Sequence, residues 1–160
     1  MSDAIKIKSL SKSFGPINAV RNISFNVGYG EVLGFLGPNG AGKSTTMKMI
    51  TGFLAPTSGT VEVNNHDVLE DPLSVKRSIG YLPEGAPAYG EMTVKSFLNF
   101  IADIRELNGS LRKERLDEVI ETINIGSVID QSIETLSKGY KRRVGLAQAI
   151  LHDPNILIMD

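Results

Sequence analysis

The residues best suited to chemistry lie in one short glycine-rich stretch, GPNGAGKST, at residues 37–45. Its pattern, G-x-x-x-x-G-K-[ST], is that of a loop between a strand and a helix that binds phosphate groups. Glycines at 37, 40 and 42 let the backbone curl so that consecutive N–H groups point inward at phosphate oxygens. The stretch therefore predicts a nucleotide site.

Each position of this loop has a predicted role. Lys43 can reach the β- and γ-phosphates, the Ser44 hydroxyl can ligate Mg²⁺, and Thr45 lies on the α-phosphate side. The helix that begins there adds its positive N-terminal end. A glycine-rich turn without a ligand is the alternative, but it does not require a Lys-Ser pair at the start of a helix. The predicted nucleotide contacts are Gly37, Pro38, Asn39, Gly40, Ala41, Gly42, Lys43, Ser44 and Thr45.

The segments around the loop must position it. Residues 32–36, VLGFL, form a continuous apolar run, which predicts a strand buried on both faces that leads into the loop. Runs at 5–10, 23–27 and 60–63 alternate between apolar and polar residues, which predicts half-buried strands.

Helices dominate the second half of the sequence. Thr93 is predicted to cap the first of two amphipathic helices, and a third helix begins after Ser137. The final stretch, NILIMD at 155–160, predicts a short buried strand with a carboxylate at its tip. This order of elements predicts an α/β fold with an inserted helical part.

The composition excludes several classes of function. Lys plus Arg is 17 and Asp plus Glu is 18, a balance that gives no general attraction to nucleic acid or to membrane surfaces. There are no cysteines, which excludes disulfides and thiolate chemistry. No apolar run approaches the ~20 residues of a membrane-spanning helix. We expect a cytoplasmic protein with no nucleic-acid partner.

A second stretch, residues 134–160, together with the phosphate loop resembles the ATP-binding-cassette (ABC) ATPases. The resemblance covers essentially all of residues 4–160 and implies a P-loop NTPase core with an N-terminal antiparallel β part and an inserted helical subdomain. In that family a serine-led motif opens a helix that binds the γ-phosphate of ATP held by the opposite subunit. The resemblance implies this role for Ser137 and Gly139.

Other positions match the family one by one. Phe14 corresponds to the aromatic residue that stacks on adenine, with a core role as the alternative. Glu84 stands where the family usually has a glutamine that touches Mg²⁺ and the attacking water, and a surface glutamate without a ligand is the alternative. Asp160 corresponds to the aspartate that holds Mg²⁺ through water. The implied catalytic residues are Lys43, Glu84 and Asp160, and the implied metal ligands are Ser44, Glu84 and Asp160.

The serine-led motif at residues 136–140, the signature motif, departs from the common family pattern. Lys138 and Tyr140 stand where a glycine and a glutamine are usual, and Lys138 adds positive charge beside the γ-phosphate. The sequence of this motif is most similar to that of bacterial exporter-type ATPases. His66 and His152, the histidines of the sequence, are predicted to be structural.

The resemblance also implies a domain organisation. Residues 1–92 are expected to form the β part and phosphate-loop core, 93–135 the helical subdomain, and 136–160 the signature helix and last strand. In the family, a catalytic glutamate and later a switch histidine follow the position of Asp160. We therefore expect residues 1–160 to be the N-terminal part of a longer domain that is incomplete at the C-terminus. We expect this part to bind ATP without hydrolysing it efficiently.

In the fold of this family, the strand that contains Leu33 and the strand that contains Leu157 are separated by a further strand, which comes later in the chain. Each buried backbone group left unpaired there costs about 1–3 kcal/mol. We therefore expect residues 1–160 alone to be unstable, rearranged or completed by another chain.

The implied function is that of an ATP-binding transporter subunit that uses ATP and Mg²⁺. Its implied partners are a membrane permease and a second ATPase subunit, identical or not, which would place it peripherally on the inner face of the plasma membrane. A soluble ABC ATPase of translation or chromosome maintenance is one alternative, and a binding-only fragment is another. The absence of sustained heptads between Lys43 and Leu136 argues against the chromosome type.

Overall fold

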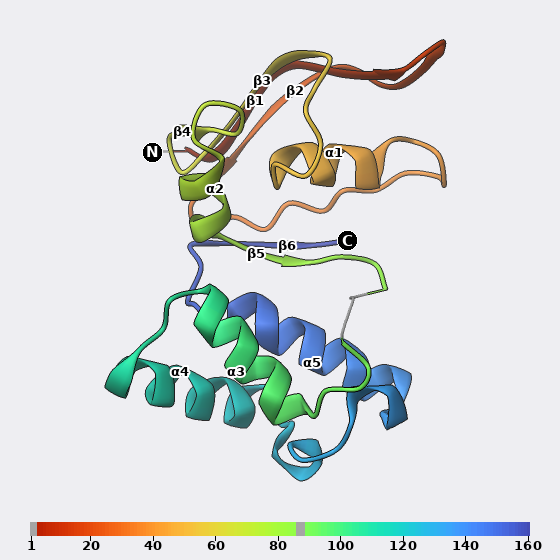
Figure 1. Cartoon of the computed structure of the whole chain (residues 1–160). Helices are drawn as coiled ribbons and strands as arrows, with labels where there is room; N and C mark the ends of the chain where they lie inside the picture. Colours follow the sequence, from red (N-terminus) through yellow and green to blue (C-terminus); the bar gives the residue numbers. More distant parts are fainter. Residues whose placement is uncertain (1–2, 86–88) are drawn as a thin grey trace. The chain divides into compact units, whose positions relative to one another are not determined.

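The computed structural model of the chain describes residues 3–85 and 89–160, and it divides into two compact units at the Ser78–Ile79 junction (Figure 1). The first unit contains β1 (Asp3–Phe14), β2 (Ile17–Gly28), α1 (Lys43–Ile50), β3 (Ser58–Val63), β4 (His66–Asp67) and α2 (Pro72–Ser78). The second contains β5 (Ile79–Leu82), α3 (Val94–Ile104), α4 (Gly109–Thr122), η1 (Gly126–Val128), η2 (Ile133–Thr135), α5 (Lys138–Ile150) and β6 (Ile156–Met159). The predicted α/β fold is confirmed.

An antiparallel sheet with the strand order β2-β1-β3-β4 forms the first unit. Ile7 lies at its centre, opposite Phe25 on β2 and Val61 on β3. Ile7 and Val61 are buried, as is Met49 of α1, so the alternating apolar positions of the strands face the helix. The strands β1 and β2 extend further than the predicted alternating runs and meet in a hairpin after Phe14.

The prediction of a buried strand at residues 32–36 is wrong. This segment is neither helix nor strand, and no described strand pairs with it. Val32 is 96% exposed and Leu36 is 94% exposed. A continuous apolar run predicts burial only where neighbouring strands cover both faces, and no described strand pairs with this segment, which connects the turn at Gly30 to the phosphate loop.

Three helices with a shared apolar core form most of the second unit (Figure 1). Leu98 of α3, Val119 of α4 and Val144 of α5 are all buried in this core. The predicted caps are confirmed: the Thr93 side chain accepts a hydrogen bond from the Ser96 N–H, and Ser137 accepts one from the Tyr140 N–H. The helix α3 ends at Ile104, and Asn108 is the N-cap residue of α4.

Arg115 ties α4 to the C-terminal end of α5. Its Nε donates to the Leu151 carbonyl at 3.0 Å and its Nη2 to the Ile150 carbonyl at 2.9 Å. Carbonyls in the last turn of a helix have no partner within the helix, and a cation there is also favourable to the helix dipole. The end of α5 is thereby fixed just before the chain turns into β6.

The strands β5 and β6 pair in parallel, with Gly80 opposite Leu157. A Cβ at Gly80 would lie 2.2 Å from the carbonyl oxygen of Ala149, so α5 packs directly on the β5 backbone. The last strand is buried on one face only, which corrects the prediction of a buried strand. Ile158 is buried, whereas Leu157 is 42% exposed and Met159 is 55% exposed, because successive side chains point to opposite faces.

Both histidines have structural contacts, as predicted. His66 lies in β4, and its Nδ1 is 2.9 Å from a carboxylate oxygen of Asp71. His152 lies between α5 and β6, with Nε2 3.1 Å from the Ile79 carbonyl oxygen, to which it donates. None of the helices in the described residues combines the length and the apolar character that crossing a membrane requires.

Burial makes His152 a source of pH-dependent stability. Burial, together with the nearby charge of Arg105, lowers the pKa of His152 from 6.5 to about 4. Between pH 6.5 and 4 the unfolded chain therefore binds a proton that the folded chain does not, and stability is lost as the pH falls through this window. At about 1.4 kcal/mol per pKa unit the full shift corresponds to about 3.5 kcal/mol, and because the His152 side chain is only partly buried, we expect a loss of about 2–3 kcal/mol.

The variant His152→Gln tests this prediction, because the Gln amide can still donate to the Ile79 carbonyl but does not titrate. Urea unfolding at a series of pH values should show a shallower decline for the variant than for the unaltered chain between pH 6.5 and 4. Equal slopes in that window would contradict the prediction.

Candidate phosphate-binding site

The loop before α1 leads into a helix N-terminus that no side chain caps. Gly42 caps the helix in a left-handed conformation, with φ 89° and ψ 11°, and no side chain caps the first turn. The first helical bond runs from the Thr46 N–H to the Gly42 carbonyl at 2.9 Å. The N–H groups ahead of Thr46 have no partner within the helix, and they lie at the positive end of its dipole. This arrangement favours an anion.

Close packing against β2 fixes the loop in place. A Cβ at Gly42 would lie 2.4 Å from the Ala19 carbonyl oxygen and 3.1 Å from Val20 Cγ2. Gly40 is also left-handed, at φ 83°, but the space around its missing Cβ is open. Gly42 is therefore required both by its backbone conformation and by its contact with β2, whereas Gly40 is required by its conformation alone.

Lys43 folds back over the loop. Its Nζ donates to the Gly37 carbonyl at 2.7 Å and to the Pro38 carbonyl at 2.9 Å. These bonds use two of the three ammonium donors and hold the positive charge at the loop. A cation held beside a helix N-terminus without a side-chain cap suits a phosphate group, and the adjacent Ser44 lies in the same helical turn.

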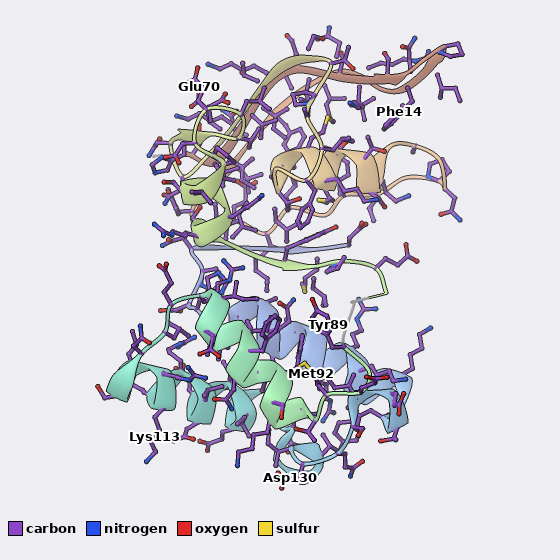
Figure 2. All side chains as sticks on the ribbon, viewed as in Figure 1. Phe14, Glu70, Tyr89, Met92, Lys113 and Asp130 are labelled. Atoms are coloured by element: carbon purple, nitrogen blue, oxygen red, sulfur yellow. The ribbon has the colours of Figure 1, made fainter. Side chains whose placement is uncertain are left out.

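Phe14 lies at the tip of the β1–β2 hairpin, on the arm above the loop that leads into α1 (Figure 2). Its side chain is 47% exposed, which excludes the alternative of a core role. The Lys12 ammonium lies 5.1 Å from the centroid of the ring. The ring is thus an exposed aromatic surface in the same unit as the phosphate loop.

The predicted carboxylates belong to the second unit and share one edge of its sheet. Glu84 follows β5, and Asp160 follows β6 directly. These strands are parallel with Leu82 opposite Met159, so both residues come after the carboxyl ends of paired strands. The Asp160 N–H donates to the Leu82 carbonyl at 2.9 Å, which extends the pairing to the last residue.

The negative charge of Asp160 affects the pKa of a neighbouring tyrosine, Tyr81. Burial, and secondarily the Asp160 carboxylate, raise the pKa of the Tyr81 hydroxyl above its usual 10.0. Within the described part of the chain, no group of three or more His, Cys, Asp or Glu residues could by itself hold a metal ion. Hydroxyl and carboxylate oxygens, as offered by Ser44, Glu84 and Asp160, are nevertheless the ligand type that Mg²⁺ prefers.

Ser137 and Gly139 lie at the N-terminal end of α5. The Ser137 hydroxyl caps the helix through the Tyr140 N–H at 3.3 Å, an ordinary structural role. Contact of Ser137 and Gly139 with a phosphate stays a prediction.

The structure thus brings the predicted site residues together in two groups. Phe14 and residues 37–45 belong to the first unit, and Glu84, Ser137, Gly139 and Asp160 to the second. The sequence reasoning missed Ala19, against which the loop packs, and Lys12, which covers a face of the Phe14 ring. Nothing in their residue types marked these two positions.

Comparison with known proteins identifies the class. Residues 20–160 match the model of the family described as "ABC transporter", so the chain belongs to this family. Solved structures agree with this assignment. The chain superposes on an ATP-binding subunit of an ABC transporter with a TM-score of 0.90 and 29% sequence identity, over 98% of this chain and 65% of that one. The resemblance and the P-loop NTPase fold are confirmed.

Named relatives refine this picture. The chain is 40% identical over 156 residues to the ABC transporter ATP-binding protein YxlF of Bacillus subtilis, covering 98% of this chain and 51% of that protein. It is 35% identical over 160 residues to the bacitracin transport ATP-binding protein BcrA of Bacillus licheniformis, covering 100% of this chain and 51% of that protein. The chain spans about half the length of these curated relatives.

Replacing Gly42 by alanine tests the packing of the loop on β2. Gly42→Ala and Gly40→Ala both force alanine into a left-handed conformation, but only the former drives a Cβ into the Ala19 carbonyl oxygen. A strained residue costs about 1–3 kcal/mol, and we expect the clash to make Gly42→Ala at least about 1 kcal/mol worse than Gly40→Ala. Urea unfolding followed by circular dichroism measures both. Equal losses of stability would show that the close approach to Ala19 does not hold the loop.

Proposed function

We propose that the chain is the ATP-binding part of an ABC transporter subunit and that residues 37–45 hold the phosphates of ATP. The observation that carries the proposal is the geometry of the loop. The Lys43 ammonium is held by the Gly37 and Pro38 carbonyls beside the N-terminus of α1, which no side chain caps. A polyphosphate bound at this loop would interact both with the fixed positive charge of Lys43 and with the oriented backbone N–H donors at the start of α1.

Different residues of the proposed site contact different parts of the nucleotide. Backbone N–H groups of the loop and the first turn of α1 bind the phosphate oxygens, and Lys43 neutralises the terminal phosphates. Phe14, exposed at the hairpin tip, offers a surface on which the base can stack. Ser137 and Gly139 are proposed to bind the γ-phosphate of an ATP held by another subunit.

The oxygen ligands of the chain fit Mg²⁺. Ser44, Glu84 and Asp160 are proposed to hold it, directly or through water. Bound with ATP, the ion would neutralise the charge that develops on the phosphates. Asp160 is fixed by its backbone bond to Leu82, so its carboxylate has a defined place at the end of β6.

For the whole subunit we propose ATP hydrolysis coupled to transport through a membrane permease, with two ATPase subunits acting together at the inner face of the membrane. Relatives named for bacitracin transport and for linearmycin resistance support a role in export over a soluble mechanical role. Residues 1–160 are proposed to supply the ATP-binding step of this cycle.

A titration of the 160-residue chain with Mg²⁺–ATP tests the proposal. Lys43→Ala removes a charged contact to phosphate, worth about 1.5–3 kcal/mol, so we expect the dissociation constant to rise about 10- to 100-fold. Lys48→Ala is the matched control, because Lys48 is an exposed lysine of the same helix. Its affinity should equal that of the unaltered chain.

Isothermal calorimetry or a fluorescent ATP analogue gives the constants, with a thermal melt of each variant to show that it folds. Saturable binding that is equally strong in Lys43→Ala would contradict the proposal. An equal loss in both variants would assign the effect to net charge and not to the loop.

A further inference from the structure

We propose that Lys12 is a positioning residue for the nucleobase. Its ammonium group occupies one face of the Phe14 ring, so that the base of a bound ATP stacks on the opposite face. This inference rests on the proposed function, because it requires ATP at the phosphate loop.

Two contacts hold the Lys12 ammonium in place. Its Nζ lies 5.1 Å from the centroid of the Phe14 ring and donates to the Ala55 carbonyl at 2.8 Å. A cation at this distance from a ring centroid is attracted by the negative face of the ring. The hydrogen bond to Ala55 keeps the ammonium from moving away, so one face of the ring is covered.

The backbone that carries the two residues is fixed as well. The Ser13 N–H donates to the Thr57 hydroxyl at 3.0 Å, and the Thr57 N–H donates to the Ser11 carbonyl at 2.9 Å. Across the hairpin, the Ser13 hydroxyl donates to Asn18 Oδ1 at 2.6 Å. Lys12 and Phe14 therefore lie on a strand end that is bonded on both sides, and their arrangement does not depend on a ligand.

The ring lies within reach of a nucleotide held by the loop. Phe14 pairs with Ile17, and Ala19, the residue against which Gly42 packs, is two positions further along β2. At about 3.4 Å per residue, the ring is displaced along the strand by about 7 Å from the contact between loop and sheet. A ribose can bridge a gap of this size between phosphate and base.

The cation changes how the open face of the ring interacts. Stacked aromatic rings repel where two negative faces meet, and a cation on the far side withdraws electron density from the ring. The open face of Phe14 then accepts the electron-rich face of adenine more readily. The covered face is closed to the base, so one stacking arrangement remains.

The test compares two ligands on the 160-residue chain: Mg²⁺–ATP, and Mg²⁺–tripolyphosphate, which lacks a base. Lys12→Met keeps the length of the side chain and removes its charge. We expect the dissociation constant for ATP to rise about two- to fivefold and that for tripolyphosphate to stay unchanged. Lys8→Met, an exposed lysine on the same strand, makes the same change in net charge and should alter neither constant.

A double-mutant cycle separates an effect through the ring from any other effect. In the Phe14→Leu background, which has no ring, Lys12→Met should no longer change the affinity for ATP. The inference is overturned if Lys12→Met leaves ATP binding unchanged, weakens tripolyphosphate equally, or keeps its effect without the ring.

The Lys43→Ala variant distinguishes this failure from that of the proposed function. If Lys43→Ala weakens both ligands while Lys12→Met has no effect on ATP, only the inference about Lys12 fails. If Lys43→Ala changes neither ligand, or if the unaltered chain binds no ATP, the proposed function fails and the inference fails with it.

Discussion

The phosphate loop depends on one close approach, that of Gly42 to the Ala19 carbonyl of β2. No other residue type fits there, because the position combines a left-handed backbone with no room for a Cβ. This contact sets the start of α1 against the sheet, and the start of α1 sets the position of Lys43 and of the N–H groups of the first helical turn. The antiparallel sheet is thus the support of the anion site as well as the core of the first unit.

The second unit also contains a glycine with no room for a Cβ: at Gly80, α5 packs on the backbone of β5. Arg115 holds the far end of that helix through two carbonyls, and β6 follows within a few residues. The helix that begins at Ser137 and the strand that ends at Asp160 are therefore parts of one packed assembly. A shift of α5 along its axis would alter the packing beside both predicted site segments.

The sequence predicted the loop and the helix caps well, because each depends on local chemistry: positive φ at glycine, and a hydroxyl that accepts from an N–H two or three residues later. It failed at residues 32–36, whose burial depends on strands elsewhere in space and not on the segment itself. The same reason explains β6, where Leu157 and Met159 are exposed. Phe14 shows a third case: its residue type permitted a core role, and only the structure shows its exposure and its partner Lys12.

The cationic and aromatic residues of the proposed site belong to a different unit of the chain from its carboxylates. The first unit holds the cations and the aromatic ring, Lys43, Lys12 and Phe14, which suit the phosphates and the base of a nucleotide. The second holds the carboxylates, Glu84 and Asp160, whose oxygens suit a divalent ion. Affinity for the nucleotide should therefore arise mainly in the first unit. A loop whose lysine is already in place can bind phosphate without the carboxylates.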